Sequence, residues 1–180
     1  MVHTIPWNRL LLDVGFGLDT EVCIKGQQHS LYSVGTKNLS APDYIKGFAA
    51  FAELFEQYPE TRTSTLEIEF FANQAVVAVP LNSTAYPWRD IQAQVMIQMS
   101  FTGSPTGPAA EAANAVAQNL RTAFTKTSGY DQLEVYVSYA HGDEDPSAWY
   151  GVDKLDRLVT LKNKWDPNNL FQFDNGIPLK

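Results

Sequence analysis

The sequence predicts an α+β fold in which an antiparallel sheet is covered on one face by helices. Two observations support this prediction. Apolar and polar residues alternate at 65–71, 91–101 and 133–140, as expected of strands that bury one face. Apolar residues follow helical spacing at 40–58 and 109–127. A helix layer on one side of such a sheet would leave its other face polar and open.

Length and composition are typical of one compact domain. The chain has 180 residues, of which 44% are apolar and 18% charged, so we expect a single domain over residues 1–180. The formal net charge is -7, and the sequence contains no basic stripe that could meet phosphate groups. Nucleic acid and anionic membranes are therefore not expected as partners.

Several residues bear on the cellular compartment. The single Cys23 excludes an internal disulfide and is expected to be a small buried side chain. No apolar run is long enough for a membrane helix, and the first residues do not resemble a signal peptide. We expect a cytoplasmic chain, with secretion as the alternative if it is a piece of a longer precursor. In the cytosol, the glycosylation sequons at 38–40 and 82–84 would have no role.

The N-terminal third contains the first expected elements. Residues 7–14 are expected to form two helical turns, and 21–24 and 30–34 a hairpin. A helix should then begin near Ser40, whose side chain can cap it. The expected buried stripe of this helix consists of Tyr44, Ile45, Phe48, Phe51, Ala52 and Phe55.

Four strands are expected in the rest of the chain, at 65–71, 75–79, 91–101 and 133–140. The strand at 91–101 alternates most regularly and has a side rich in amides. If the strands pair as their alternation suggests, their polar sides form one open face. That face would carry Glu67, Glu69, Gln92, Gln94, Gln98, Glu134, Tyr136 and Ser138.

The segment 102–108, rich in Gly and Pro, joins a strand to a helix, as phosphate-binding loops do. It lacks the Gly-Lys-[Ser/Thr] ending and the Gly-x-Gly-x-x-Gly spacing, so we expect a plain connection. The helix at 109–127 should end before Gly129. Its expected buried residues are Val116, Leu120 and Phe124.

The closing stretch is expected to form a helix followed by a strap. Asp153 can cap this helix, and Asp166-Pro167 ends it. Its expected buried stripe consists of Leu155, Leu158 and Val159. The tail should then fold back over the core through Trp165, Leu170 and Phe173.

Three segments in the second half carry a family resemblance. They are Thr84-Ala-Tyr-Pro-Trp-Arg-Asp90, Tyr136-Val-Ser-Tyr139 and the C-terminal set Tyr150-Gly151, Arg157-Leu158 and 162–171. In this order they are similar to a Thr-Ala-x-Pro-[His/Trp]-Arg-Asp turn, a Tyr-x-Asn-Tyr strand and a Lys-x-Lys-[Tyr/Trp]-Asp-Pro-x-Asn-x-Phe strap. These patterns resemble the berberine-bridge-enzyme-like branch of FAD-linked oxidases.

The resemblance implies the substrate domain of such an oxidase, with the family's C-terminal signature at about 134–177. Members of the family also have a flavin-binding half, with Gly-rich turns and a His, sometimes with a Cys, bonded to the flavin. These 180 residues show no match to that half. We therefore expect no cofactor on this chain alone, and FAD only if a partner chain supplies the flavin domain.

The resemblance also implies where chemistry would occur. In the family the open sheet face looks toward the flavin, and a tyrosine of the Tyr-x-Asn-Tyr strand is a base or an orienting group. Together with the expected open face, this makes the catalytic candidates Tyr136, Gln98, Gln94 and Glu69. The substrate-binding candidates are Tyr139, Ser138, Glu134, Tyr86, Trp88 and Arg89. Since a tyrosine with a pKa near 10 keeps its proton at neutral pH, Tyr136 would need a nearby cation such as Arg89 to act as a base.

Each candidate also has a structural interpretation. The polar residues could form an ordinary solvated sheet face, and Arg89 could clamp its own turn. Ser138 departs from the family's Asn, which weakens the case for a flavin ring resting against it. The cluster His141, Asp143, Glu144 and Asp145 is interpreted as a polar loop whose Asp145-Pro146 begins a helix, and no metal site is expected.

Three functions remain open at this point. We favour a flavin-free cyclase or isomerase, pericyclic or proton-transferring, that acts on a small hydrophobic metabolite of fungal-type secondary metabolism. The second is a subunit or fragment of an FAD-dependent oxidoreductase whose FAD domain is a separate chain. The third is a non-catalytic protein that binds small molecules. A sheet face that would otherwise meet a domain predicts a homo-oligomer or a flavin-domain partner.

Overall fold

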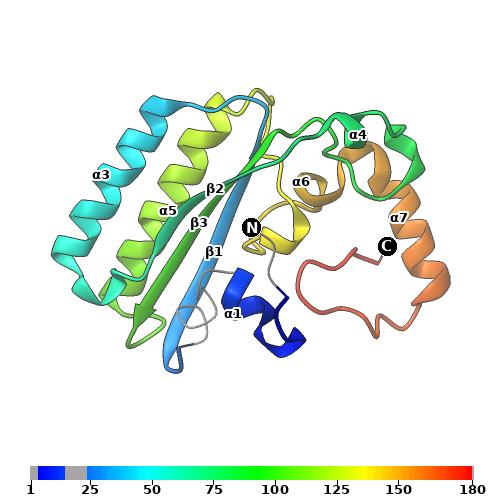
Figure 1. Cartoon of the computed structure of the whole chain (residues 1–180). Coiled ribbons are helices and arrows are strands. Elements are labelled where there is room, and N and C mark those ends of the chain that lie inside the picture. The colour runs from blue at the N-terminus through cyan, green and yellow to red at the C-terminus, as the bar shows by residue number, and fades with distance from the viewer. Residues whose placement is uncertain (1–3, 15–23, 180) are drawn as a thin grey trace.

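A computed structural model describes residues 4–14 and 24–179, without the side chains of residues 11 and 14. Its sheet has three antiparallel strands in the order β1-β3-β2. Figure 1 shows α3 and α5 side by side on one face of this sheet, with α6, α7 and the C-terminal tail on the other side. The predicted α+β class is confirmed. The strands are β1 (Gln27–Thr36), β2 (Thr65–Phe70) and β3 (Ala93–Thr102).

The helices account for most of the remaining regular structure. Of those in the described residues, six are α-helices and four are short 3-10 helices. The described helices are η1 (Trp7–Arg9), α1 (Leu10–Val14), α3 (Ala41–Gln57), η2 (Pro59–Thr61), α4 (Gln74–Val77), η3 (Leu81–Ser83), α5 (Pro108–Thr127), η4 (Val137–Tyr139), α6 (Pro146–Tyr150) and α7 (Val152–Trp165). No helix in the described part of the chain is long and apolar enough to cross a membrane.

The core lies between the sheet and the two long helices. Val34, Val95 and Ile97 are fully buried on the helix side of the sheet. Helix α5 faces them with alanines and with Phe124, and the small side chains let it approach the strands closely. The predicted helices at 40–58 and 109–127 and the strand at 91–101 are thus confirmed. So is the cap at Ser40, whose hydroxyl accepts a hydrogen bond from the Asp43 N–H.

The predicted stripe of α3 is only partly right. Phe51 is buried, and Tyr44 and Phe55 pack against the core, but Ile45 and Phe48 are exposed. Helix α3 approaches the sheet at Gly47, where a Cβ atom would lie 2.7 Å from Leu66 Cδ2. This close approach turns the flank that carries Ile45 and Phe48 away from the strands.

The strand predicted at 75–79 is wrong. Both neighbours of the central strand β3 are taken, by β1 and by β2, so no place beside it remains. Residues 71–92 instead form a long connection that contains α4 and η3, and we call it the β2–β3 loop. Asn73 Nδ2 closes its base by donating to the Ile91 carbonyl at 3.0 Å. The predicted hairpin is also not observed as such, because β1 pairs with β3 and residues 21–23 lie outside the described residues.

The strand predicted at 133–140 is wrong as well. This segment is irregular and then turns through η4, and it meets β1 at the free edge of the sheet. The Gly35 N–H donates to the Glu134 carbonyl at 2.7 Å, and the Val135 N–H donates to the Ala148 carbonyl at 2.9 Å. Because Val135 bonds to the α6 region rather than to a strand, the alternation at 133–140 reflects burial under two different neighbours.

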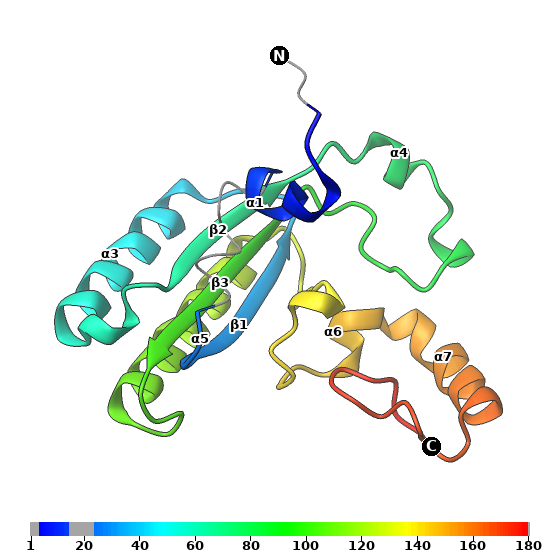
Figure 2. The same ribbon diagram turned by 60° about the horizontal axis from the view of Figure 1, so that its bottom comes forward.

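The C-terminal region differs from expectation in two details. Asp145 caps α6 as predicted, by accepting from the Ser147 N–H at 2.8 Å. Helix α7, however, begins after Gly151, whose φ of 76° suits glycine, and Asp153 lies in its first turn instead of capping it. The strap is anchored at Asp166, but its side chains Trp165, Leu170 and Phe173 are exposed. Figure 2 shows this tail beside α6 and α7, so it does not cover the core.

Candidate functional site

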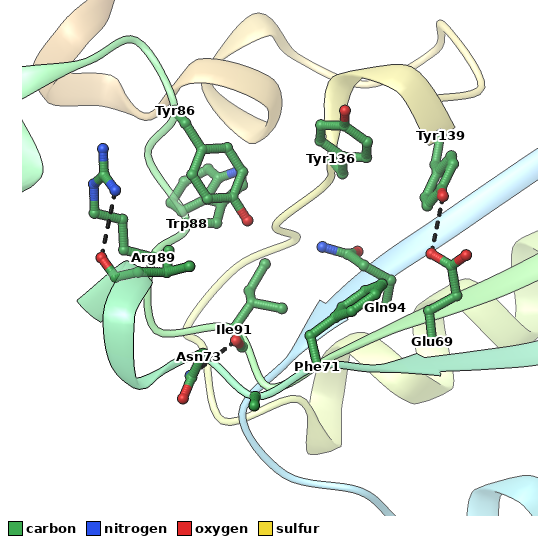
Figure 3. A pocket seen from close by; sticks show the side chains of 12 residues that line it. Glu69, Phe71, Asn73, Tyr86, Trp88, Arg89, Ile91, Gln94, Tyr136 and Tyr139 are labelled. Carbon is green, nitrogen blue, oxygen red and sulfur yellow. Dashed lines mark hydrogen bonds between the residues drawn. The ribbon is translucent and has the colours of Figure 1, made fainter. Parts of the chain in front are cut away.

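A pocket of about 280 Å³ lies where the open sheet face meets the β2–β3 loop and the segment around η4. Figure 3 shows Glu69 and Gln94 reaching into it from the sheet, with Tyr136 and Tyr139 on the opposite side and Tyr86 and Trp88 at its flank. Its lining is mostly apolar. The lining residues are Glu69, Phe71, Ala72, Asn73, Val76, Tyr86, Trp88, Arg89, Ile91, Gln94, Tyr136 and Tyr139.

The pocket gathers most of the residues proposed from the sequence. Seven of them line it, namely Glu69, Gln94, Tyr136, Tyr139, Tyr86, Trp88 and Arg89. Gln98 does not, because it lies four residues farther along β3, roughly 13 Å away, where it donates to Ser100 Oγ. Ser138 faces a different, polar cavity beside Trp149 and Asn175.

Glu134 is the third predicted residue outside the pocket. It is 4% exposed, so it belongs to the interior rather than to an open face. Burial, with Asp90 nearby, raises the pKa of its carboxyl from 4.5 to about 8, although Lys37 opposes this shift. Its Oε2 atom has no hydrogen-bond partner among the described residues. Its placement on the polar face is therefore wrong, since the segment 133–140 is not a strand.

The acid group of the pocket is Glu69. It is the direct neighbour of Gln94 across the β2–β3 ladder, so their Cβ atoms lie about 5 Å apart. The Tyr139 hydroxyl donates to Glu69 Oε2 at 2.9 Å. Burial and the Glu69 carboxylate together raise the pKa of Tyr139 to about 12. Tyr139 thus keeps its proton at neutral pH, and Glu69 is the hydrogen-bond acceptor of the pair.

Gln94 presents an acceptor that the described part of the chain leaves unused. The residue is 5% exposed, and its Oε1 atom has no hydrogen-bond partner among the described residues. A buried acceptor left unpaired costs about 1–3 kcal/mol. A bound molecule with an O–H or N–H group would remove this cost.

Aromatic rings form the outer part of the pocket. The Tyr136 ring meets Tyr139 edge to face at a centroid distance of 5.1 Å, and it meets Tyr86 in the same way at 6.4 Å. Burial raises the pKa of Tyr86, so its hydroxyl also stays protonated. Such a frame suits a flat apolar ligand better than an ion.

Arg89 clamps the β2–β3 loop instead of approaching Tyr136. Its guanidinium donates to the Val76 carbonyl at 3.4 Å and to Thr84 Oγ1 at 2.6 Å. Figure 3 shows Tyr86 between Arg89 and Tyr136. The expected cation beside Tyr136 is therefore absent at this position, and the structural interpretation of Arg89 is confirmed.

Five lining residues were not predicted. Phe71, Ala72, Asn73 and Val76 belong to the β2–β3 loop, where the sequence had predicted two strands, at 65–71 and 75–79, joined by a turn. Ile91 enters the pocket because Gly35 leaves space for it, as a Cβ atom there would lie 2.2 Å from Ile91 Cδ1. The length of the connection was the available signal, since long loops often form binding sites.

The acidic loop after His141 is a structural connection. Arg121 of α5 donates to both Asp143 oxygens and to Glu144 Oε1, at 2.6 to 2.8 Å. Glu144 also accepts from the Trp149 indole. In the described ranges, no group of three His, Cys, Asp or Glu residues could hold a metal ion.

Comparisons with known proteins point to one family. The family model "Berberine and berberine like" matches residues 135–178. FAD-linked oxidoreductase srdI of Neurospora crassa is 44% identical over 177 residues, which is 98% of this chain and 35% of srdI. FAD-linked oxidoreductase tazL of Aspergillus terreus is 38% identical over 178 residues, again 98% of this chain and 35% of the relative. The chain thus spans about a third of the length of these curated relatives.

Solved structures agree on the fold. Berberine bridge enzyme from Eschscholzia californica superposes with a TM-score of 0.63 at 16% identity, over 86% of this chain and 33% of that enzyme. The structure of FgChi7B gives a TM-score of 0.60 at 24% identity, over 85% of this chain and 34% of that one. At these identities the likeness concerns the arrangement of helices and strands alone.

Proposed function

Because the comparisons confirm the resemblance to berberine-bridge-enzyme-like FAD-linked oxidoreductases, we propose that this chain forms the substrate-side part of such an oxidoreductase. One observation carries the proposal. The unpartnered acceptor of Gln94 lies beside the Glu69–Tyr139 pair at the inner end of an apolar, aromatic pocket. This arrangement fits a small organic molecule that carries an O–H or N–H group.

The lining fits one part of a flavin and not another. Tyr86 and Tyr136 offer an aromatic frame for a flat ring, and Gln94 and Glu69 offer acceptors. The phosphates of FAD, by contrast, find no cationic cradle around the pocket in the described part of the chain, since Arg89 is held by Val76 and Thr84. We infer that sequence outside these residues would hold the dinucleotide, either in a longer polypeptide or in a partner chain.

In this proposal the chain binds the substrate and accepts the proton that the substrate releases. When bound, FAD would supply the acceptor for a hydride. The substrate's O–H or N–H group donates to Gln94 Oε1 and to Glu69, and Glu69 takes the proton as the carbon is oxidised. Tyr139 stabilises the Glu69 carboxylate through its hydrogen bond and does not itself titrate at neutral pH, because its pKa is about 12. This assigns Glu69 the role of base, with Tyr136 as an orienting ring.

A chimera tests the proposal directly. This chain would replace the matching third of the Neurospora relative, and the purified protein would be recorded for visible flavin absorption and for its bleaching by candidate phenols and alcohols. We expect a yellow protein whose flavin is reduced by substrate. Glu69→Gln should lower that rate on the order of 10²-fold while the flavin stays bound. Glu67→Gln, on the same strand and outside the pocket, is the matched control. Equal rates in Glu69→Gln and the unchanged chimera would refute the role of Glu69.

The flavin-free cyclase or isomerase is the second candidate. It is favoured by the position of Glu69, Gln94 and Tyr136 around one pocket, where they can polarise or deprotonate a ligand. Holding a reactive conformer can remove roughly 7 to 11 kcal/mol of a barrier in favourable cases. Turnover of a metabolite by the colourless chain alone, lost in Glu69→Gln, would support this function over the first.

A partner is proposed on the basis of exposed apolar side chains. Phe171 and Phe173 of the tail are 75% and 77% exposed, and Ile45 and Phe48 form a second exposed group on α3. We propose that a flavin-binding part or a second copy of the chain covers these groups. The mass in solution distinguishes these two partners. A dimer of the chain alone would indicate a second copy, and a complex with the flavin-binding part of a relative would indicate the other partner.

A further inference from the structure

Trp88 has a second set of contacts besides its ring in the pocket. Its indole N–H donates to the Val135 carbonyl at 3.1 Å and to the Ala148 carbonyl at 3.0 Å. The Val135 N–H donates to the same Ala148 carbonyl at 2.9 Å. The Trp88 indole N–H, the backbone of Val135 and the Ala148 carbonyl are thus all joined by hydrogen bonds, and Val135 and Ala148 are buried.

This set joins two parts of the chain that are far apart in sequence. Trp88 lies in the second half of the β2–β3 loop, which forms one wall of the pocket, while Val135 directly precedes Tyr136, which belongs to another wall. On its other side the same segment is held to the sheet, because the Glu134 carbonyl accepts from the Gly35 N–H at 2.7 Å. The backbone before Tyr136 is thus fixed by two contacts, one from the sheet and one from Trp88.

The position of Tyr136 matters for the rest of the site. Its ring stands edge to face on Tyr139, at a centroid distance of 5.1 Å, and Tyr139 in turn donates to Glu69. A displaced Tyr136 would therefore change the packing around the group that holds the Glu69 carboxylate. Trp88 itself has an edge-to-face contact with Tyr130 at a centroid distance of 6.3 Å, which favours this orientation of the indole.

We propose that Trp88 is a positioning residue: its indole N–H, shared between the Val135 and Ala148 carbonyls, sets Tyr136 over the pocket and locks the β2–β3 loop against the Tyr136 segment. The consequence for catalysis rests on the proposed function, but the positioning of Tyr136 does not. A substitution that removes the N–H and keeps an aromatic ring should release Tyr136. A substitution that keeps a ring N–H should restore it.

The test uses the full chain labelled with 3-fluorotyrosine and followed by ¹⁹F NMR, with Tyr136 and Tyr139 assigned by their loss in Tyr136→Phe and Tyr139→Phe. In Trp88→Phe we expect the Tyr136 and Tyr139 signals to shift or broaden, while that of Tyr58, remote from the pocket, stays in place. In Trp88→His, which retains a ring N–H, the two signals should move back toward their original positions. Trp165→Phe is the control, because it removes the N–H of an exposed indole that does not line the pocket.

The ¹⁹F signals test the role of Trp88, and flavin reduction in the chimera tests the proposed function, so each can fail without the other. Unchanged Tyr136 and Tyr139 signals in a folded Trp88→Phe chain would overturn the inference, whatever happens to its melting temperature. In the flavin-containing chimera, Trp88→Phe should lower kcat roughly tenfold with little change in KM, since positioning and not binding is altered. Moved signals in a chimera that never reduces flavin would contradict the proposed function and still support the role of Trp88.

A measurement on the unchanged chain covers the case in which Trp88→Phe does not fold. Hydrogen exchange of the Trp88 indole N–H should be at least about tenfold slower than that of Trp165, which is 73% exposed. Exchange of Trp88 as fast as that of Trp165 would show that the shared hydrogen bond is not maintained, and it would overturn the inference.

Discussion

The two faces of the sheet differ in their buried groups: one buries apolar side chains against helices, and the other also buries polar atoms that have no hydrogen-bond partner among the described residues. On the helix side, Val34, Val95 and Ile97 are fully buried against α3 and α5. On the other side, Ser33 Oγ and Gln94 Oε1 are buried without a hydrogen-bond partner among the described residues. Burial of apolar side chains on the helix side stabilises the fold, whereas the unpaired polar atoms on the pocket side can form hydrogen bonds to a ligand. This contrast predicts that substitutions on the two faces have different, and partly opposite, effects.

The largest effect is expected on the helix side. Phe124→Ala removes a ring that is 2% exposed and leaves a cavity between α5 and the sheet. The free energy of unfolding should fall by about 3–5 kcal/mol. Urea denaturation followed by circular dichroism measures this loss, and Phe171→Ala in the exposed tail, which should change stability by less than about 0.5 kcal/mol, is the control. Equal losses in both variants would contradict the assignment of the core.

The next effect concerns Glu134 and depends on pH. Its pKa is raised from 4.5 to about 8 in the folded chain, so the folded state holds this proton more tightly than the unfolded state. The stability contributed by the neutral form is fully present below about pH 4.5 and is lost as the pH rises to about 8. Glu134→Gln stays neutral, so it should be about 1–3 kcal/mol more stable than the original chain at pH 8 and similar to it at pH 4.5.

Denaturation midpoints at both pH values check this expectation. The control is Glu60→Gln, which removes an exposed carboxylate and should not show the same pH-dependent gain. If Glu134→Gln gains no stability at pH 8 over pH 4.5, the carboxyl is not held neutral by burial.

Substitution of Gln94 on the pocket side is expected to have opposite effects on stability and on ligand binding. Gln94→Leu replaces an unpaired buried amide by an apolar side chain of similar size, so the free energy of unfolding should rise by about 1 kcal/mol. The same change should weaken binding of a probe such as p-cresol, measured by tryptophan fluorescence, by about tenfold. Gln98→Leu, outside the pocket, should leave probe binding unchanged. Lower stability with unchanged binding would mean that the Gln94 amide is satisfied within the chain.

The smallest effect on stability is expected in the tail. Replacing Phe171 and Phe173 together by Ser should change the free energy of unfolding by less than about 0.5 kcal/mol, since both rings are exposed. It should nevertheless reduce self-association or binding to a flavin-binding part, as measured by light scattering. Loss of stability with unchanged association would show that these rings pack within the chain.

Much of the fold could be predicted from local patterns. Alternation at 65–71 and 91–101 placed Glu69 and Gln94 on the same polar face, and the register Glu69↔Gln94 confirms this. Tyr136 and Tyr139 line the pocket as the family resemblance implied, although the strand expected to carry them does not form. These residues therefore lie around one pocket although the predicted secondary structure of their segment was wrong.

What remained hidden depends on contacts between distant segments. The wall made by Phe71, Asn73 and Val76 exists because β2 already occupies the place beside β3, and this forces residues 71–92 into a loop. The burial of Glu134 follows from the contact of its segment with the free edge of β1 at Gly35. Neither the loop at 71–92 nor the burial of Glu134 is indicated by a periodic pattern in the surrounding sequence.

By itself, the sequence determined the helix-covered antiparallel sheet and the polar character of its other face, because these follow from the spacing of side chains along one segment. It indicated Tyr136 and Tyr139 only through the family resemblance. Only the tertiary structure decided which polar residues share a pocket, that Glu69 rather than Tyr139 is the acceptor of their hydrogen bond, and that Trp88 joins two walls. The physical reason is that hydrogen-bond partners and burial are set by segments that meet only after folding.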